Sequence, residues 1–297
     1  MKKKGRRGFV REVAGTAALL SFGCHDRTGE RPRMSEQRSE RMPVVFVGHG
    51  SPMHAIAHNR WSRAFTGLGR ALPKPRAILA ISAHWFVNGT WITAQPRPET
   101  IHDFGGFPRA LFEVQYPAPG QPDLADRVRG LLAAHEAEAK DDWGLDHGTW
   151  SVLRWMSPEA DVPVIQLSLD RRLAPRRHLE IGRALAPLRD EGVLIFGSGN
   201  VVHNLRDAIG RMQRRDGETP GWAARFDRDV EAALGQRDEA ALLDRLETDD
   251  GRLSHPTPEH WLPLLYAAGA SLEGDAVSFP IEGFDAGSIS MRAVRWG

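Results

Sequence analysis

Beyond residue 43, short apolar segments alternate with amphipathic ones. Runs such as AILAIS, VPVIQLSL and GVLIF are continuously apolar, which is typical of strands buried on both faces of a sheet. The segments between them repeat their apolar residues with helical spacing and predict helices that cover the sheet. We therefore predict a single α/β domain with a largely parallel or mixed central sheet flanked by helices.

The pattern also predicts where these elements lie. The expected strands are Val44–Val47, Ala77–Ser82, Trp91–Ala94, Pro163–Leu169 and Val193–Phe196. The expected helices are Trp61–Ala71, Pro122–Glu136, Arg177–Arg189, Trp222–Leu234, Ala240–Leu246 and Pro258–Ala268. The last stretch, AVSFPIEGFDAGSISMRAVRWG, has no helical period and predicts a closing hairpin.

Composition narrows the possible partners and ligands. The chain has 297 residues, 41% apolar and 26% charged, with a formal net charge of +1. A charge so close to zero gives no overall field to attract nucleic acid. The one cysteine, Cys24, allows no internal disulfide and no cysteine-rich zinc site. Any metal would therefore be held by histidine and carboxylate.

The first 42 residues do not follow the pattern of the rest. Residues 1–24 join a basic start, with Arg6 and Arg7 before Phe9, to a short apolar run, which resembles a twin-arginine export signal. Residues 25–42 predict a polar tether, and residues 43–297 the catalytic domain. This organisation predicts a periplasmic or exported protein without a transmembrane span, with lipid attachment at Cys24 as a variant. Translation from Met34 or Met42 would instead give a cytoplasmic protein.

Three of the predicted strands run into a histidine flanked by small residues. His49 follows PVVFVG, His84 follows AILAISA, and His203 follows GVLIFGSGNVV. Ligands of open α/β sheets bind beyond the carboxyl ends of the strands, so these three rings should meet in one pocket. The neighbouring glycines and serines leave room for a ligand to approach the backbone.

Other segments carry candidate residues with open alternatives. His260 falls in the first turn of the helix expected after Pro258, where the helix dipole would keep it neutral and able to bind metal. His147, in DHGTW, suits either a functional donor in the pocket wall or a loop anchor. The loop IHDFGGFP, with His102 and Phe104, suits either a lid or aromatic wall, or a plug at the sheet edge. Trp85 is one of several aromatic residues near these motifs that favour an aromatic substrate.

A histidine cluster without thiolate suits zinc, iron(II), manganese or nickel. In such sites a hydrolase activates water, whereas a non-haem iron enzyme uses the open positions for substrate and dioxygen. Composition and spacing do not choose between these two uses.

Six ordered motifs resemble one known family. GHGSPM, SAHWF, TIHDFGGFPRALFEVQYPAPG, DHGTWSVL, GSGNVVHNL and PTPEHWLPLLYAAGA resemble the DOPA-dioxygenase-type extradiol ring-cleavage family, of the class III, protocatechuate-dioxygenase-like superfamily. The resemblance runs from about Pro43 to the C-terminus. It implies an oxidoreductase that opens the ring of a catechol-type aromatic diol with dioxygen to a muconic semialdehyde.

The resemblance also implies residue roles. His49, His84 and His260 match the metal-ligand positions, and His203 matches a histidine described both as a fourth ligand and as the acid–base residue. His147 would hydrogen-bond the substrate or the oxygen species, and His102, Phe104 and Trp85 would line the substrate pocket. One divalent metal is implied, with Fe(II) expected for activity. A histidine at 260, where distant relatives have glutamate, makes Zn(II) easier to accept as the bound species.

Two competing interpretations stay open at this point. The same histidines permit a zinc-dependent amide or ester hydrolase, with His203 or Asp146 handling protons. A non-catalytic metal-binding module of the same fold is the third interpretation. The natural catechol and the oligomeric state are not predicted by the sequence.

Overall fold

The computed structural model describes residues 41–297. Within this part of the chain, eight strands form one sheet in the order β4-β3-β5-β2-β6-β1-β10-β7, and β8 and β9 form a separate small hairpin. The strands are β1 (Val44–Gly48), β2 (Ala77–Val87), β3 (Trp91–Thr93), β4 (Glu138–Lys140), β5 (Val164–Asp170), β6 (Val193–Gly199), β7 (Val277–Ile281), β8 (Phe284–Asp285), β9 (Ile289–Ser290) and β10 (Ala293–Trp296).

The sheet is parallel at its centre and antiparallel toward one edge. β1 and β2 both run parallel to β6, and β2 also runs parallel to β5. β10 is antiparallel to both β1 and β7, so the C-terminal stretch does close the sheet with antiparallel strands, as its pattern predicted. The prediction of one α/β domain with a mixed sheet flanked by helices is confirmed.

Both faces of the sheet are buried, as the continuous apolar runs predicted. Along β1, Val44 and Phe46 join one hydrophobic cluster, while Val45 and Val47 join the other, because successive strand residues point to opposite faces. α5 (Pro175–Leu185) and α10 (Leu262–Ala270) pack together on the first face, and α1 (Arg60–Ala71) packs with α4 (His147–Met156) on the second.

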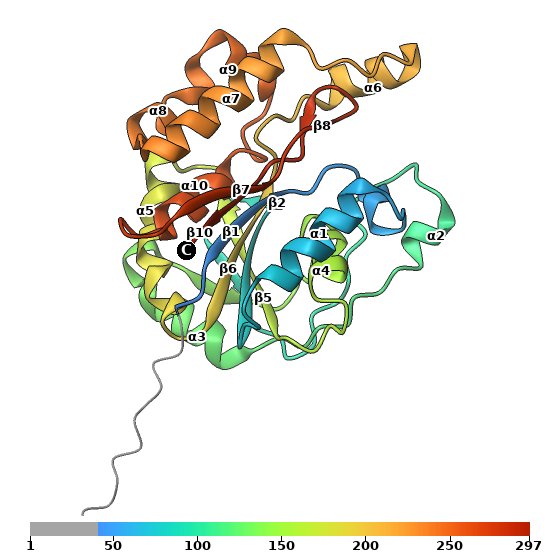
Figure 1. Ribbon diagram of the computed structural model, residues 1–297. Helices are drawn as coiled ribbons and strands as arrows, with labels where there is room; N and C mark the ends of the chain where they lie inside the picture. The colour runs from blue at the N-terminus through green and yellow to red at the C-terminus, as the bar shows by residue number, and fades with distance from the viewer. Residues whose placement is uncertain (1–40) are drawn as a thin grey trace, which may run out of the picture. The chain divides into compact units, whose positions relative to one another are not determined.

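The remaining helices complete the domain (Figure 1). α2 (Arg109–Phe112) and α3 (Pro122–Leu131) come from the long connection between β3 and α4. α6 (Leu205–Arg214), α7 (Gly221–Gln236), α8 (Glu239–Leu243) and α9 (Asp249–Ser254) gather beyond one end of the sheet. Short 3-10 turns are η1 (Pro52–Ala55), η2 (Ala133–His135), η3 (Ala186–Arg189) and η4 (Arg245–Glu247).

Helices α2, α6 and α9 were not predicted, and two further features of the fold differ from the sequence-based prediction. β4 was not predicted, because Glu138–Lys140 is a short, polar edge strand that pairs only with β3. The helix predicted from Pro258 begins at Leu262, so His260 lies in the turn before it rather than in its first turn. The backbone of that turn hydrogen-bonds to β6, since the carbonyl of His260 accepts from Asn200 N–H at 2.9 Å.

The predicted signal segment, residues 1–24, and most of the predicted tether, residues 25–42, lie outside the described residues. Between residues 41 and 297, no helix combines the length and the apolar character needed to cross a membrane.

Candidate metal centre

The carboxyl ends of three adjacent strands meet at the centre of the sheet. In the strand pairing, Gly48 of β1 lies opposite Gly199 of β6, and Ser82 of β2 lies opposite Ser198. His49 follows β1 directly, and its backbone N–H donates to the Gly199 carbonyl at 3.0 Å. The central parallel strands thus bring their histidines to one edge, as predicted.

A glycine allows the His260 turn to approach this edge. A Cβ atom at position 199 would lie 2.2 Å from the His260 carbonyl oxygen, far closer than van der Waals contact allows. Only glycine at this position leaves space for the turn. The turn therefore holds the His260 ring beside the ends of β1 and β6.

The histidine rings form a compact cluster. The ring centroids of His49, His84 and His260 are separated by 5.0, 5.3 and 5.2 Å, which is nearly an equilateral triangle. The ring of His147, from the first turn of α4, lies 3.8 Å from that of His84 and 5.7 Å from that of His49. The ring of His203 stacks on that of His260 at 3.5 Å with an interplanar angle of 4°. All five histidines predicted for the centre therefore lie together.

Two overlapping groups of three follow from two different measures. Possible ligand atoms of His49, His84 and His147 all lie within 4.8 Å of one another. The ring centroids of His49, His84 and His260 lie 5.0–5.3 Å apart, which makes His260 a second candidate for the third position. Both groups share the pair His49–His84.

The rings of His49, His84, His147 and His260 each have a polar partner at Nδ1, the outer nitrogen, which points away from the centre of the cluster. His49 Nδ1 lies 3.0 Å from Ser198 Oγ, which itself donates to the Gly148 carbonyl at 2.6 Å. His84 Nδ1 and His147 Nδ1 face one oxygen of Asp103 at 3.2 and 2.9 Å. His260 Nδ1 lies 3.2 Å from a carboxylate oxygen, Oε1 of Glu259. Such partners orient the histidines of metal sites and fix their tautomers.

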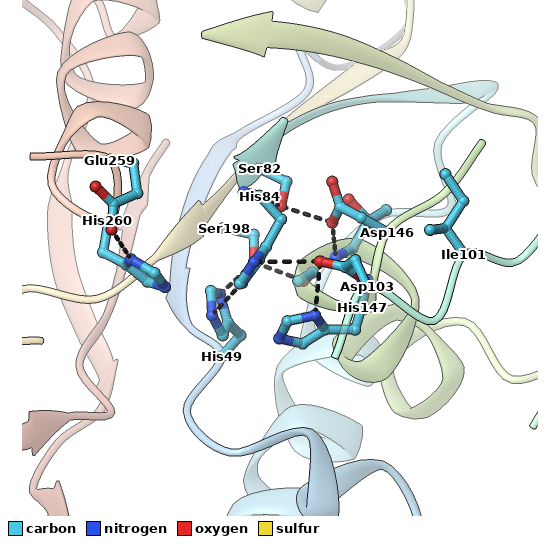
Figure 2. Close-up of polar contacts among 12 residues, drawn as sticks. His49, Ser82, His84, Ile101, Asp103, Asp146, His147, Ser198, Glu259 and His260 are labelled. Carbon is cyan, nitrogen blue, oxygen red and sulfur yellow. Dashed lines mark hydrogen bonds and ion pairs between the residues drawn. The ribbon is translucent and has the colours of Figure 1, made fainter. Parts of the chain in front are cut away.

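These partners leave two lone pairs facing each other. Ser198 donates its own proton to Gly148 and Asp103 is ionised, so His49 and His84 both carry their proton on Nδ1. Their Nε2 atoms lie 3.2 Å apart, with no proton left to place between them (Figure 2). Two nitrogens bound at about 2.0–2.1 Å to one tetrahedral zinc would be roughly 3.4 Å apart. The site therefore fits a shared divalent cation.

Burial keeps these rings neutral and able to bind metal. Desolvation, and next the neighbouring histidines, lower the pKa values of His49, His84 and His260 well below 6.5. Burial, then His255 and His147, lower the pKa of His203 to about 3. Burial opposes the ionisation of Asp103, but its hydrogen bonds and charge interactions with His147 and His84 prevail and lower its pKa to about 2. Neutrality of His260 thus follows from burial and not from a helix dipole.

A buried polar network supports the cluster from behind. Asp146 caps the start of α4 by accepting from Thr149 N–H, and it also accepts from Ser82 Oγ at 2.6 Å and from the amide of Gln166. Burial, and next the charge of Asp103, raise the pKa of Asp146 to about 6. The network fixes the beginning of α4, which carries His147, relative to β2, which carries His84.

The residues predicted to bind substrate occupy different places. Phe104 lies edge-on to His147 with ring centroids 5.4 Å apart, so it borders the cluster. His102 Nε2 donates to the Val114 carbonyl at 3.0 Å, which anchors the loop. Trp85 is buried and stacks on Trp143, and as the neighbour of His84 in β2 it points to the other side of the strand. The structure therefore brings Phe104, but not Trp85, to the histidines.

Sequence reasoning did not assign roles to Asp103 and Ser198. Both stand inside the motifs IHDFGGFP and GSGNVVHNL, but their partners come from other segments of the chain: His84 and His147 for Asp103, and His49 for Ser198. The sequence could indicate only that a polar residue stands within a motif of the site. The partner of that residue follows from the fold.

Comparisons with known proteins identify the family to which the chain belongs. The family described as the catalytic LigB subunit of aromatic ring-opening dioxygenase matches residues 42–287. A 4,5-DOPA dioxygenase extradiol of Escherichia coli K12 is 48% identical, over 87% of this chain and 96% of the relative. One of Beta vulgaris is 41% identical, over 85% and 96%. A crystal structure of an uncharacterized protein from Escherichia coli K12 matches with a TM-score of 0.76 and 42% identity, covering 86% of this chain and all of that one.

The fold and the histidine cluster define an α/β metalloprotein with a divalent-metal site. The chain belongs to the LigB family of aromatic ring-opening dioxygenases. The prediction of an oxidoreductase that acts on an aromatic ring with dioxygen is confirmed, and the hydrolase and binding-module alternatives are not supported.

Proposed function

We propose that this protein opens the ring of a DOPA-like catechol beside its two hydroxyls, with dioxygen, to give a muconic semialdehyde. The supporting observation is the pair of unprotonated nitrogens, His49 Nε2 and His84 Nε2, 3.2 Å apart inside a histidine cluster. The names of the relatives from Escherichia coli and Beta vulgaris support the extradiol position and the DOPA-like substrate.

We assign the metal to His49, His84 and His260, with iron(II) as the active ion and zinc as a species that binds without supporting the reaction. Bound iron(II) would supply the redox chemistry that lets dioxygen react with a catechol, which zinc cannot supply. The nearly equal separations of the three rings favour this set, and neutral imidazoles with anchored outer nitrogens suit it.

Two further histidines handle protons in this proposal. His203 is neutral because it is buried, and its ring is stacked on His260 at the edge of the cluster. Its position in the cluster, and not its basicity, is the reason for assigning it the proton of a catechol hydroxyl, since a lowered pKa by itself weakens a base. His147 donates its Nδ1–H to Asp103, which leaves Nε2 free to accept a hydrogen bond from the substrate.

The loop that carries Phe104 forms the aromatic wall. The ring of Phe104 contacts Phe107 and Phe112 at centroid distances of 5.4 and 5.1 Å and is nearly perpendicular to the ring of His147, at an interplanar angle of 80°. A planar catechol ring packs against such rings favourably, by about 0.5–1.5 kcal/mol for each aromatic pair. His102 supports this wall by fixing the loop to Val114.

Anaerobic reconstitution with iron(II) or zinc tests the proposal. Catechols including DOPA are added, then air, while absorbance and oxygen uptake are recorded. We expect a yellow product and one dioxygen consumed per catechol with iron only, and product loss in His203→Ala. His135→Ala, which changes a histidine at η2 outside the cluster, serves as the matched control. Turnover under argon, or no oxygen uptake with any catechol despite bound iron, would contradict the proposal.

A further inference from the structure

One carboxylate contacts two histidines that come from different elements. Oδ2 of Asp103 lies 2.9 Å from His147 Nδ1 and 3.2 Å from His84 Nδ1. Its other oxygen, Oδ1, accepts the backbone N–H of His147 at 2.9 Å. A single side chain from the loop after β3 therefore holds both the end of β2 and the beginning of α4 (Figure 2).

The chemistry of a carboxylate determines where these histidines carry their protons. An ionised carboxylate accepts hydrogen bonds and donates none, so each ring nitrogen that faces it must bear a proton. A neutral imidazole has one proton, and with that proton on Nδ1 the other nitrogen, Nε2, keeps its lone pair. The two lone pairs then belong to the sides of His84 and His147 that do not face Asp103.

We propose that Asp103 is a positioning residue that fixes the Nδ1–H tautomers of His84 and His147 together. It thereby presents one Nε2 lone pair to the metal and one to the substrate, although Asp103 itself touches neither. The part of the proposal that concerns the metal rests on the proposed function. The tautomers themselves are a property of the metal-free protein.

Asp103 also joins the aromatic wall to the histidine cluster. Phe104 is its neighbour in the chain and borders His147, while His102 on the other side is anchored to Val114. The same short loop therefore provides both Phe104 of the aromatic wall and the Asp103 carboxylate that contacts the histidines. This coupling predicts that a change at Asp103 alters the metal site and the aromatic wall in one step.

The Asp103→Asn variant separates this role from simple loop anchoring. Asparagine has the same shape but only one acceptor oxygen, so it cannot serve both the His147 backbone N–H and the two rings. If its oxygen takes the backbone N–H, its amide group donates to the rings and requires them to carry their protons on Nε2. If its oxygen faces the rings, its amide group confronts the backbone N–H.

Long-range proton–nitrogen NMR of the metal-free protein reads the tautomers directly. In the wild type we expect Nδ1–H at both His84 and His147, with signals assigned by single-histidine substitutions. In Asp103→Asn we expect at least one of the two to change to Nε2–H. An Nε2–H tautomer at either ring in the wild type would overturn the proposal, even if the variant failed to fold. Unchanged tautomers in a folded variant whose His147 backbone N–H stays hydrogen-bonded would also overturn it.

Zinc affinity, measured by competition with a chromophoric chelator, gives a second readout. We expect Asp103→Asn to bind zinc roughly 10- to 100-fold more weakly than the wild type, the usual effect of losing an outer partner of a ligand. The matched control is Asp285→Asn, because Asp285 holds His54 Nε2 at 2.9 Å outside the cluster. The control should keep the wild-type zinc affinity, and equal affinity in Asp103→Asn would contradict the positioning role.

The two readouts distinguish the possible failures. A wild-type protein that binds no metal, yet shows both Nδ1–H tautomers, would remove the proposed function and keep the tautomer assignment. A wild-type protein that binds metal, with an Asp103→Asn variant identical to it in tautomers and affinity, would remove this inference and keep the proposed function.

Discussion

His147 and His260 compete for the third position beside His49 and His84. His147 has possible ligand atoms within 4.8 Å of the pair, and Asp103 orients its ring as it orients the ring of His84. His260 completes the more regular triangle and has its own outer partner in Glu259. The two assignments make opposite predictions for single substitutions.

We expect His260→Ala to weaken zinc binding by roughly 100-fold or more, since zinc sites share about 10–16 kcal/mol among four ligands. His147→Ala should keep zinc affinity within about threefold and lower kcat with iron by roughly 10- to 100-fold, the effect of losing a substrate hydrogen bond of about 1.5–3 kcal/mol. Chelator competition and steady-state oxygen uptake measure the two effects. The reverse pattern would assign the third position to His147.

At the residue scale, sequence reasoning located the histidines better than their partners. His49 and His84 stand at the ends of recognisable strands, and strand ends meet wherever parallel strands pair. Asp103 comes from an irregular loop, and its contacts depend on the path of that loop and not on any period. The opposite directions of His84 and Trp85 follow from strand geometry, and aromatic content alone could not indicate which of the two would face the site.

At the element scale, the contact between α4 and β2 depends on a glycine. A Cβ atom at Gly148 would lie 2.5 Å from Ser82 Oγ and 2.9 Å from His84 Cδ2. Alanine normally favours a helix over glycine by about 1 kcal/mol, but here the added methyl group must displace His84 or the whole first turn of α4. The steric effect should therefore outweigh the helix propensity.

Gly148→Ala should weaken zinc binding by roughly tenfold or more, because the added methyl group shifts His84, a proposed ligand. Gly130→Ala is the matched control, since Gly130 lies exposed in α3 with nothing within 4 Å of its added Cβ. The control should keep zinc affinity and raise the free energy of unfolding by up to about 1 kcal/mol. Wild-type zinc affinity in Gly148→Ala would show that α4 can move without disturbing His84.

The elements themselves were predicted to different degrees. The strands at the centre of the sheet were found because burial on both faces gives continuous apolar runs, as in β1 and β6. β4 was missed because a three-residue polar edge strand carries no such signal. The late start of α10 was also missed, because the preceding turn is held by β6 through Asn200, a contact remote in sequence.

At the scale of the whole molecule, buried neutral histidines make stability depend on pH. His178, on α5, is fully buried with Nδ1 3.1 Å from the hydroxyl of Tyr266 on α10. Burial lowers the pKa of His178 from 6.5 to about 4. Between these two values the unfolded chain binds a proton at this position and the folded protein does not. The free energy of unfolding therefore decreases as pH falls below 6.5 and levels off below about 4.

This one group should account for a loss of about 3 kcal/mol at most across that window. In His178→Gln, the decrease in the free energy of unfolding across the same pH window should be smaller than in the wild type by up to about 3 kcal/mol, because glutamine does not titrate. This holds even if the variant is less stable at neutral pH. Urea unfolding of both proteins at a series of pH values measures the difference. A chelator is present in all samples, so that metal release contributes to neither measurement.

His135→Gln provides the comparison, because His135 is only partly covered. Partial burial, and next Arg177, lower the pKa of His135 as well, so its removal should reduce the pH dependence of unfolding, but less than removal of the fully buried His178. The cluster histidines titrate in the same direction in all three proteins, so they cancel when the slopes are compared. A His178→Gln protein with the wild-type slope would mean that His178 gains a proton without unfolding the protein. The acid sensitivity of the fold would then lie in other buried groups, namely the cluster histidines or His255, whose pKa burial lowers to about 4.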